Sequence, residues 1–224
     1  MRQEGVRKEM TPYYDHAGIT IYHGDCRDIL PHLEPVDLVL TDPPYGIDAD
    51  IFRASLPNSK GETMIDYIVG DSDLSCVEWL FSWLGETPAV IWGSNHWPHL
   101  LPHKGRWCCW DKRLTKEADK MLGSAFELAW ENRKSGFDVM ARVLHGGVVN
   151  ADKGKRYHPT QKPVKLFESI IERYKAVTIL DPFMGSGTTL VAAKQLGRKA
   201  VGIEIEEKYC EIAVRRLAQE VLPL

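Results

Sequence analysis

The chain has 224 residues and a mass of 25.4 kDa, near the upper end of what one hydrophobic core supports, so we expect one elaborated domain. Its 44% hydrophobic and 26% charged residues and formal net charge of -3 exclude a disordered or fibrous chain. The sequence has no apolar run near the roughly 18 residues of a membrane helix and no apolar stretch at its start that could act as a signal peptide. We therefore expect a cytoplasmic protein without a membrane partner.

In chain order, the pattern of apolar residues predicts fourteen segments. They are a strand at 19–22, a short helix within 24–33, a strand at 36–41, a loop over 47–70, a helix at 74–84, strands at 89–92, 107–110 and 126–130, a Gly-rich basic surface insertion over 135–157, a helix at 163–174, a strand at 177–180, a helix at 188–196, a strand at 199–203 and a helix at 206–221. Because strands and helices alternate in the last third, we expect a parallel sheet covered on both faces.

Charge is unevenly distributed along the chain. Residues 102–165 hold 14 Lys and Arg against 7 Asp and Glu, whereas the remainder holds 14 against 24. The middle is therefore the candidate surface for a polyanion, and a set of solvated loops is the alternative. The five cysteines form no CxxC pair, and prolines interrupt the cluster of His96, His99 and His103, so we expect reduced thiols and no metal site.

A loop with two glycines follows one predicted strand and opens the next helix. It reads Asp181-Pro182-Phe183-Met184-Gly185-Ser186-Gly187-Thr188-Thr189. Glycines let the backbone turn tightly and approach a ligand, and the first N–H groups of a helix favour an anionic group. Glu204 ends the adjoining strand, where an acid can accept both hydroxyls of a ribose. The spacing fits neither GxGxxG nor GxxxxGK[ST], which disfavours a dinucleotide and a triphosphate. The loop and Glu204 together predict a site for a nucleoside-type cofactor, with a structural turn as the alternative.

A second motif, Asp42-Pro43-Pro44-Tyr45, ends another predicted strand. Asp42 and the carbonyl of Pro43 can accept the two hydrogens of an exocyclic amine on a planar base, and Tyr45 can stack on its ring. The alternative is a proline-stiffened turn with a surface tyrosine.

Together these elements resemble the S-adenosylmethionine-dependent amino-methyltransferases of DNA, and their order resembles the permuted beta class, in which the catalytic tetrapeptide precedes the glycine loop. Gly24-Asp25 matches the family element that receives the adenine amine of the cofactor. His158-Pro159-Thr160-Gln161-Lys162-Pro163 matches the element that closes over its methionine end. Three further stretches look like strand ends of phage and bacterial members: Val90-Ile91-Trp92-Gly93-Ser94-Asn95, Trp110-Asp111-Lys112 and Glu127-Leu128-Ala129-Trp130.

The resemblance implies a Rossmann-like methyltransferase fold of class α/β, with a mixed, mostly parallel seven-stranded sheet and helices on both faces. It also implies a single domain over 1–224, with a catalytic half at about 19–134, a short target-recognition insertion at about 135–157 and a cofactor half at about 158–224. The implied catalytic residues are Asp42, Pro43, Pro44 and Tyr45. The implied cofactor residues are Asp25, Cys26, Thr160, Lys162, Asp181, Phe183, Gly185, Ser186, Gly187, Thr188 and Glu204. The candidate DNA-binding residues are Asn95, Lys112, Arg142, Lys153, Lys155 and Arg156.

The implied reaction transfers a methyl group from S-adenosylmethionine to the N6 amine of adenine in double-stranded DNA after the base is flipped out. Asp in the first tetrapeptide position favours adenine by resemblance, and N4 of cytosine is the alternative amine. An RNA base or a protein amide as substrate, and a DNA-binding protein without catalysis, are further alternatives. The family includes dimers, so a homodimer stays open, and a bacterial or phage origin is expected.

Overall fold

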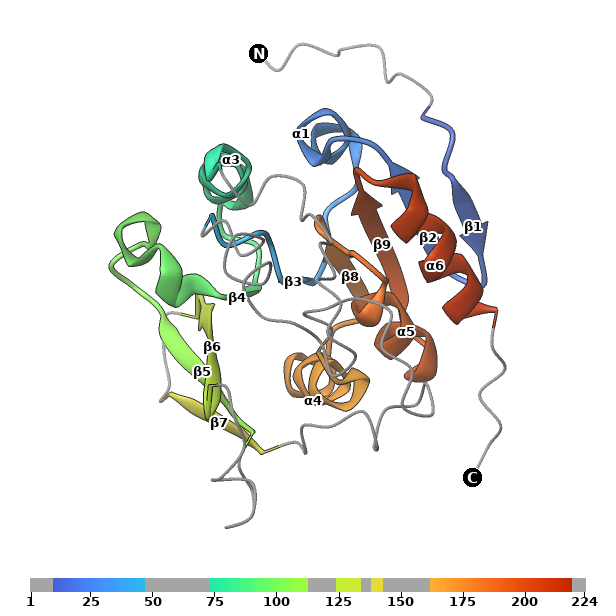
Figure 1. Ribbon diagram of the computed structural model, residues 1–224. Coiled ribbons are helices and arrows are strands. Elements are labelled where there is room, and N and C mark those ends of the chain that lie inside the picture. The colour runs from blue at the N-terminus through green and yellow to red at the C-terminus, as the bar shows by residue number, and fades with distance from the viewer. Residues whose placement is uncertain (1–9, 47–72, 113–123, 134–137, 143–161, 219–224) are drawn as a thin grey trace, which may run out of the picture.

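The computed structural model describes residues 10–46, 73–112, 124–133, 138–142 and 162–218. Within these residues, nine strands form one sheet in the order β1-β2-β9-β8-β3-β4-β6-β5-β7 (Figure 1). Their bounds are β1 (Tyr14–His16), β2 (Ile19–His23), β3 (Leu38–Thr41), β4 (Ala89–Trp92), β5 (Arg106–Asp111), β6 (Phe126–Glu131), β7 (Val139–Arg142), β8 (Thr178–Asp181) and β9 (Lys199–Glu204).

Five of the eight neighbouring strand pairs are parallel. Four of them join β2, β9, β8, β3 and β4 into a continuous block, and the fifth joins β5 with β7. The antiparallel pairs are β1 with β2, β4 with β6 and β5 with β6. The predicted mixed, mostly parallel α/β sheet is therefore confirmed.

The number of strands differs from the prediction of seven, because two short edge strands were missed. β1 reaches β2 through Ala17 and Gly18, which both have positive φ angles, of 52° and 80°. Such a turn suits the twist of a two-residue hairpin. β7 lies inside the segment 135–157 that was predicted as a surface insertion, and it pairs with β5. Because β7 has only four residues and lies in a Gly-rich, basic segment, its sequence pattern is too short to predict a strand.

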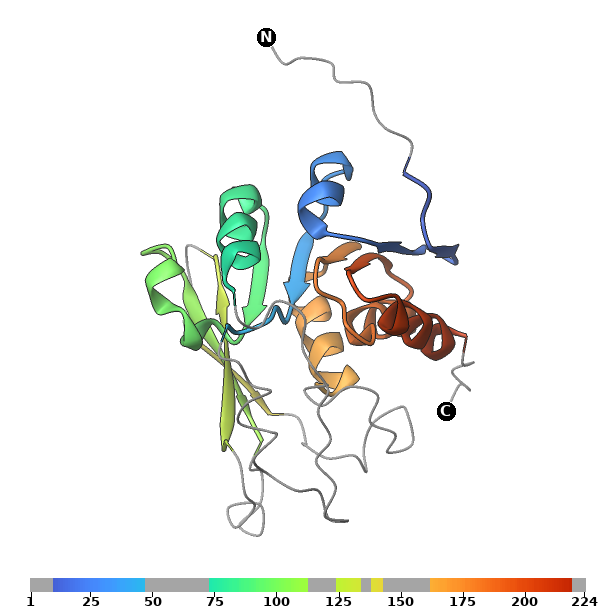
Figure 2. The same ribbon diagram turned by 45° about the horizontal axis from the view of Figure 1, so that its top comes forward.

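Helices cover both faces of the sheet, as predicted (Figures 1 and 2). The helices of the described chain are α1 (Cys26–Ile29), α3 (Ser75–Leu84), α4 (Val164–Tyr174), α5 (Thr188–Gln195) and α6 (Glu207–Leu217), with short 3-10 turns η1 (Leu30–His32), η2 (Ser94–His96) and η3 (Pro98–Leu100). In both views α1 and α3 lie on one side of the sheet and α4, α5 and α6 on the other. The predicted loop over 47–70 lies outside the described residues.

Each face of the sheet has its own core, because side chains alternate along a strand. On β3, Leu38 and Leu40 belong to the core beneath α4, α5 and α6, whereas Val39 belongs to the core beneath α1 and α3. All three side chains are fully buried. Among the described helices, none combines the length and apolar character that crossing a membrane would require.

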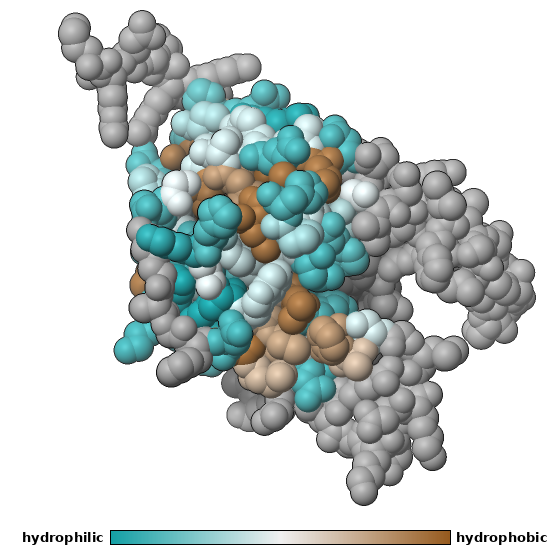
Figure 3. All heavy atoms as spheres, turned by 90° about the vertical axis from the view of Figure 1, so that its left-hand side faces the viewer, coloured by the Kyte–Doolittle hydropathy of each residue, from teal (hydrophilic) through white to brown (hydrophobic). Residues whose placement is uncertain are grey.

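The outer strands β5, β6 and β7 extend the sheet beyond the parallel block. Figure 3 shows the side of the molecule that carries them, where apolar surface lies among hydrophilic residues. Phe126 on β6 and Met140 on β7 are each about half exposed, at 50% and 52%.

The order of the strands fixes where a ligand can bind. β3 and β8 are neighbours, but the chain leads from β3 to β4 on one side and from β8 to β9 on the other. In open α/β sheets, ligands bind at such a switch point, outside the carboxyl ends of the strands. The two predicted motifs follow β3 and β8, so both lie at this point.

Candidate active site

A cavity of about 310 Å³ lies at the carboxyl edge of the parallel block. It runs past the ends of β2, β9, β8 and β3, a span of about 14 Å at roughly 4.8 Å per strand. All four predicted catalytic residues line it. Of the predicted cofactor residues, it is lined by Asp25, Cys26, Lys162, Asp181, Phe183, Gly185, Ser186, Thr188 and Glu204. Thr160 lies outside the described residues.

Gly187 does not line the cavity and has a packing role instead. It precedes α5 with a φ angle of 79°, and a Cβ atom there would lie 2.8 Å from the Cβ of Ala213 on α6. The loop can therefore approach α6 only with glycine at this position. Arg216 of α6 holds the same loop, since its guanidinium donates to the Ser186 carbonyl at 2.6 Å and to the Thr188 hydroxyl at 3.3 Å.

Glu204 fixes the conformation of the loop at the end of β9. Its Oε2 accepts the Gly185 N–H at 2.9 Å, and its Oε1 accepts the Glu206 N–H at 2.8 Å. Burial raises the pKa of Glu204 to about 7, although these N–H groups lower it. A carboxylate has about four acceptor positions, so Glu204 keeps acceptor capacity for a ligand.

Asp181 joins the two central strands. Its carboxylate accepts the Thr41 hydroxyl at 2.7 Å, the Phe183 N–H at 3.2 Å and the Thr189 hydroxyl of α5. Burial raises the pKa of Asp181 to about 6, and the hydroxyl donors counteract part of that rise. Because both oxygens are engaged, Asp181 acts in this structure as the anchor that ties the end of β8 to the end of β3.

Asp25 caps α1 at the far end of the cavity. Its Oδ1 accepts the Arg27 N–H at 2.8 Å, and its Oδ2 accepts the Arg27 guanidinium at 2.6 Å. The hydrogen bond from the Arg27 side chain holds the pKa of Asp25 below its usual value, so Asp25 is an anion at neutral pH. The adjacent Cys26 thiol is buried, which raises its pKa to about 12, and it contributes apolar wall rather than a thiolate.

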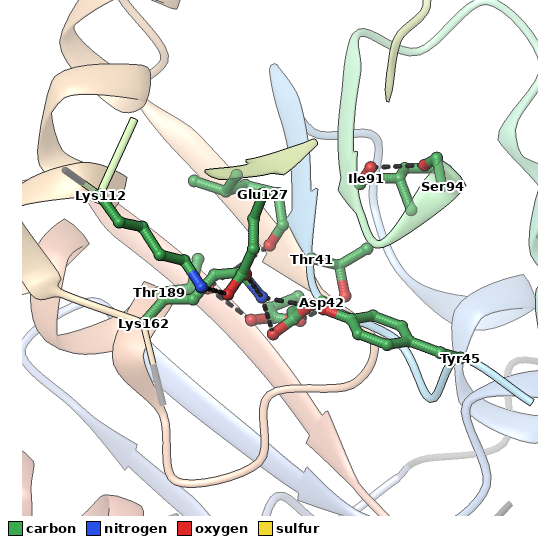
Figure 4. A network of polar contacts seen from close by, with 11 residues as sticks. Thr41, Asp42, Tyr45, Ile91, Ser94, Lys112, Glu127, Lys162 and Thr189 are labelled. Atoms are coloured by element: carbon green, nitrogen blue, oxygen red, sulfur yellow. Dashed lines mark hydrogen bonds and ion pairs between the residues drawn. The ribbon is translucent and has the colours of Figure 1, made fainter. Parts of the chain in front are cut away.

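Asp42 lies in a network of four charged side chains and a tyrosine (Figure 4). Its Oδ1 accepts the Tyr45 hydroxyl at 2.7 Å, and its Oδ2 accepts the Lys162 ammonium. Lys162 also lies 3.3 Å from Glu127 Oε2, and Lys112 pairs with the other oxygen of Glu127. The network therefore links residues that follow β3 and β5, a residue on β6 and the residue two positions before α4.

Lys162 is charged in spite of its burial. Burial would lower its pKa, but Asp42, Tyr45 and Glu127 together raise it above the usual lysine value. The same surroundings raise the pKa of Tyr45, burial being the largest cause, so Tyr45 is a neutral phenol. The predicted cofactor residue Lys162 thus contacts the predicted catalytic Asp42 directly.

The ring of Tyr45 is held against the turn that follows β4. Gly93 has a φ angle of 74°, and a Cβ atom there would lie 2.0 Å from Cε1 of Tyr45. The His96 ring stacks on Tyr45 with 4.8 Å between centroids and 16° between planes. Glycine at position 93 is therefore required for the position of Tyr45.

The candidate DNA-binding residues are dispersed. Asn95 is exposed beside His96 in η2. The ammonium of Lys112, predicted to contact DNA, turns inward to Glu127, and its side chain is only 12% exposed. Arg142 lies on β7, but its side chain is outside the described structure, as are Lys153, Lys155 and Arg156. The described part of the chain shows no group of three or more His, Cys, Asp or Glu that could hold a metal ion.

Sequence reasoning missed the role of three polar residues at the site. Thr41 and Thr189 hold Asp181, and Glu127 holds Lys162. Thr41 immediately precedes one predicted motif and Thr189 ends the other, so an inspection of the hydroxyl residues at the motif ends could have found them. Glu127 belongs to a stretch that resembles the family, but nothing local indicates its partner 35 positions away.

Comparison with known proteins decides the family. A sequence model described as DNA methylase matches residues 104–215, which is half of the chain. YubD, a candidate methylase of Escherichia coli (strain K12), is 48% identical over 215 residues, which cover 87% of this chain and 88% of YubD. The chain belongs to the DNA methylase family. Its methyl donor is accordingly S-adenosylmethionine, and its substrate is DNA.

Solved structures of other DNA methylases share the fold. The crystal structure of the M1.HpyAVI complex with S-adenosylmethionine has a TM-score of 0.57 at 23% identity and covers 90% of this chain and 100% of that one. PvuII DNA methyltransferase, which is cytosine-N4-specific, has a TM-score of 0.59 at 15% identity and covers 96% of this chain and 92% of its own. The Rossmann-like methyltransferase fold is therefore confirmed.

The cavity of this DNA methylase suits its cofactor. It is elongated along the strand ends, with an anionic carboxylate at Asp25, a buried acid with spare acceptor positions at Glu204 and the turn before α5 in between. Such a donor and acceptor set fits a nucleoside at one end and a charged amino-acid arm at the other. Asp42, after β3, lines the cavity at the opposite end of these four strands from Asp25, which follows β2.

Proposed function

We propose that this DNA methylase transfers a methyl group to the N6 amine of adenine in double-stranded DNA. The observation that carries the proposal is Asp42-Pro43-Pro44-Tyr45 at the end of β3, opening into the same cavity as the glycine loop at the end of β8. Adenine is favoured by Asp in the first position, through the family resemblance. The permuted beta class and a single domain over 1–224 are part of the same proposal.

Each group of residues has a proposed part in binding the cofactor. Asp25 accepts hydrogen bonds from the adenine end, with Cys26 and Phe183 as apolar wall. Glu204 accepts the ribose hydroxyls. The turn before α5 lies beside the methionine part of the cofactor and is formed by Gly185, Ser186, Gly187 and Thr188. Asp181 keeps that turn in place. Thr160 and Lys162 belong to the element that covers the methionine end.

Asp42 makes the amine a better nucleophile. The lone pair of adenine N6 is delocalised into the ring, so an acceptor that holds both amine hydrogens, Asp42 together with the Pro43 carbonyl, favours a tetrahedral nitrogen with an available lone pair. The cofactor, when bound, supplies a methyl group on a sulfonium that leaves as a neutral thioether. Alignment of the two reactants can contribute roughly 7 to 11 kcal/mol. Stacking on Tyr45 offsets part of the few kcal/mol needed to flip the base.

The cation beside Asp42 bears on the fate of the amine proton. The Lys162 ammonium contacts Asp42 Oδ2 and the Tyr45 hydroxyl donates to Oδ1, so both oxygens of the carboxylate already accept hydrogen bonds. Asp42 is therefore proposed to orient and polarise the amine, and the proton is proposed to leave to water after methyl transfer.

The second candidate is methylation of N4 of cytosine. Cytosine presents a similar exocyclic amine, and the cytosine-N4-specific PvuII enzyme has the same fold with a TM-score of 0.59. The same network around Asp42 would act on that amine, so the two candidates differ in the base and not in the chemistry.

Labelling of DNA tests the proposal. The protein is incubated with tritiated S-adenosylmethionine and unmethylated bacteriophage DNA, the DNA is digested to nucleosides, and the labelled nucleoside is identified. We expect the label in N6-methyladenine. Label in N4-methylcytosine would establish the second candidate instead. A protein that binds the cofactor but labels no DNA nucleoside would contradict both, and RNA and protein amides would be assayed next.

A further inference from the structure

The ammonium of Lys162 lies between two carboxylates. Its side chain is only 3% exposed, and Nζ contacts Asp42 Oδ2, the Tyr45 hydroxyl at 3.1 Å and Glu127 Oε2 at 3.3 Å (Figure 4). An ammonium has three hydrogens to donate, and three acceptors surround it here. A buried ion without a partner is strongly unfavourable, so Lys162 can leave one carboxylate only if another receives it.

Both oxygens of Asp42 are engaged in this structure. Oδ1 accepts the Tyr45 hydroxyl, and Oδ2 accepts Lys162. A hydrogen bond from a cation to a carboxylate is roughly twice as strong as one between neutral groups. A neutral target amine therefore cannot displace Lys162 from Asp42 unless the ammonium gains a compensating contact elsewhere.

Glu127 is placed to give that compensation. Burial alone would raise its pKa, but Lys162 and Lys112 outweigh burial and hold the pKa below the usual value, so Glu127 is an anion at neutral pH. Lys112 occupies Oε1 and leaves Oε2 turned toward Lys162. Lys112 is itself steadied over the Trp110 ring, 5.1 Å from its centroid.

We propose that Glu127 is a positioning residue for methyl transfer, which receives the Lys162 ammonium when the target amine takes its place on Asp42. The inference rests on the proposed function, in which Asp42 accepts the amine hydrogens. No covalent bond changes and no proton is transferred in this step. The two lysines and two carboxylates remain neutral as a group, so the amine can enter without leaving a buried charge unpaired.

A double-mutant cycle tests the proposal. The variants are Glu127→Gln, Lys162→Met and the double variant, and the readout is the single-turnover rate of DNA methylation with saturating cofactor. We expect Glu127→Gln to lower the rate at least tenfold while the Kd of S-adenosylmethionine changes less than twofold. Because Glu127 acts through Lys162, we expect the double variant to be no slower than Lys162→Met alone.

Two further variants make the result decisive. Glu127→Asp keeps the charge and is expected to recover at least part of the rate lost in Glu127→Gln. Asp111→Asn removes a carboxylate from the adjacent strand outside the network and is expected to keep the wild-type rate. If Lys162→Met does not fold, the comparison of Glu127→Gln with Glu127→Asp decides alone.

Each outcome bears on one proposal only. A wild-type rate in Glu127→Gln, equal losses in Glu127→Gln and Glu127→Asp, or losses that multiply in the double variant would overturn the role of Glu127. A wild-type protein that labels no DNA nucleoside would instead overturn the proposed function. Any label in adenine or cytosine by the wild type leaves the test of Glu127 valid.

Discussion

Cofactor affinity should depend on pH through Glu204. Burial raises the pKa of its carboxyl from the ordinary 4.5 to about 7. Since one pKa unit corresponds to about 1.36 kcal/mol, the anion is disfavoured in the protein without cofactor by about 3 kcal/mol. The folded protein thus binds a proton that the unfolded chain releases near pH 4.5, and this contribution to stability is present at low pH and is lost as pH rises through 7.

Hydrogen bonds from the ribose hydroxyls should lower the pKa of Glu204, whereas burial raises it. The hydroxyls donate to the ionised carboxylate, so binding favours the anion and affinity rises with pH. With a pKa of about 7, the ionised fraction of Glu204 grows roughly tenfold between pH 6 and pH 8, and the Kd of S-adenosylmethionine should fall by about that factor.

Isothermal titration calorimetry at pH 6, 7 and 8 measures this dependence on the wild type and on Glu204→Gln. The amino group of the ligand titrates near the same range, so the slope of the wild type is compared with that of the variant. Glu204→Gln should bind 10 to 150 times more weakly at pH 8, since hydrogen bonds to a charged group contribute about 1.5 to 3 kcal/mol. Its amide nitrogen would also face the N–H of Gly185 or Glu206, which loosens the loop.

Glu206→Gln is the matched control. Glu206 raises the pKa of Glu204 through its charge, so this variant should keep the slope and move its midpoint to lower pH. Equal slopes in the wild type and in Glu204→Gln would refute the assignment of Glu204 to the ribose. So would equal affinities of these two proteins at pH 8.

Three more substitutions probe the site and its support. Asp42→Asn should slow methylation about 100-fold or more, because a positioned polar group at a reacting centre is typically worth that much, while calorimetry should find the cofactor affinity within twofold. Gly93→Ala should lower the methylation rate at least tenfold with unchanged cofactor binding, since its Cβ would lie 2.0 Å from Cε1 of Tyr45 and must displace the ring; a wild-type rate would show that the position of Tyr45 is unimportant. Glu131→Gln should lower the free energy of unfolding in urea by about 3 kcal/mol, because fully buried Glu131 pairs with Arg106 at 2.7 Å and with Arg173, and these two partly buried cations would lose their anion. A loss below about 1 kcal/mol would contradict this last prediction.

The parts of the site that sequence reasoning found are those in which a short segment contains the whole signal. In Asp42-Pro43-Pro44-Tyr45 and in the loop from Asp181 to Thr188, a strand runs directly into residues with restricted or unusual backbone angles. Because the carboxyl ends of parallel strands lie at the same edge of a sheet, the parallel topology alone brings the two motifs together. This is why all four catalytic candidates and nine of the cofactor candidates line the same cavity.

The parts that were missed depend on contacts between distant segments. Glu127 faces Lys162 only because β6 runs antiparallel to β4 and α4 begins beneath it, and the two residues are 35 positions apart. Glu127 occupies a strand position that alternation would equally assign to solvent. β1 and β7 were missed for a different reason, because three or four residues are too few for alternation to be recognised.

The hydrogen bond between Thr41 and Asp181 couples the positions of the two motifs. Thr41 immediately precedes Asp42, and its hydroxyl donates to Asp181 at 2.7 Å across the junction of β3 and β8. Asp181 in turn receives the Phe183 N–H and the Thr189 hydroxyl, which set the start of the cofactor loop and of α5. A displacement of the loop therefore moves the strand end that carries Asp42. Since methyl transfer requires the two reactants to be aligned closely, the fold joins the residues that hold the donor to those that hold the acceptor through one buried carboxylate.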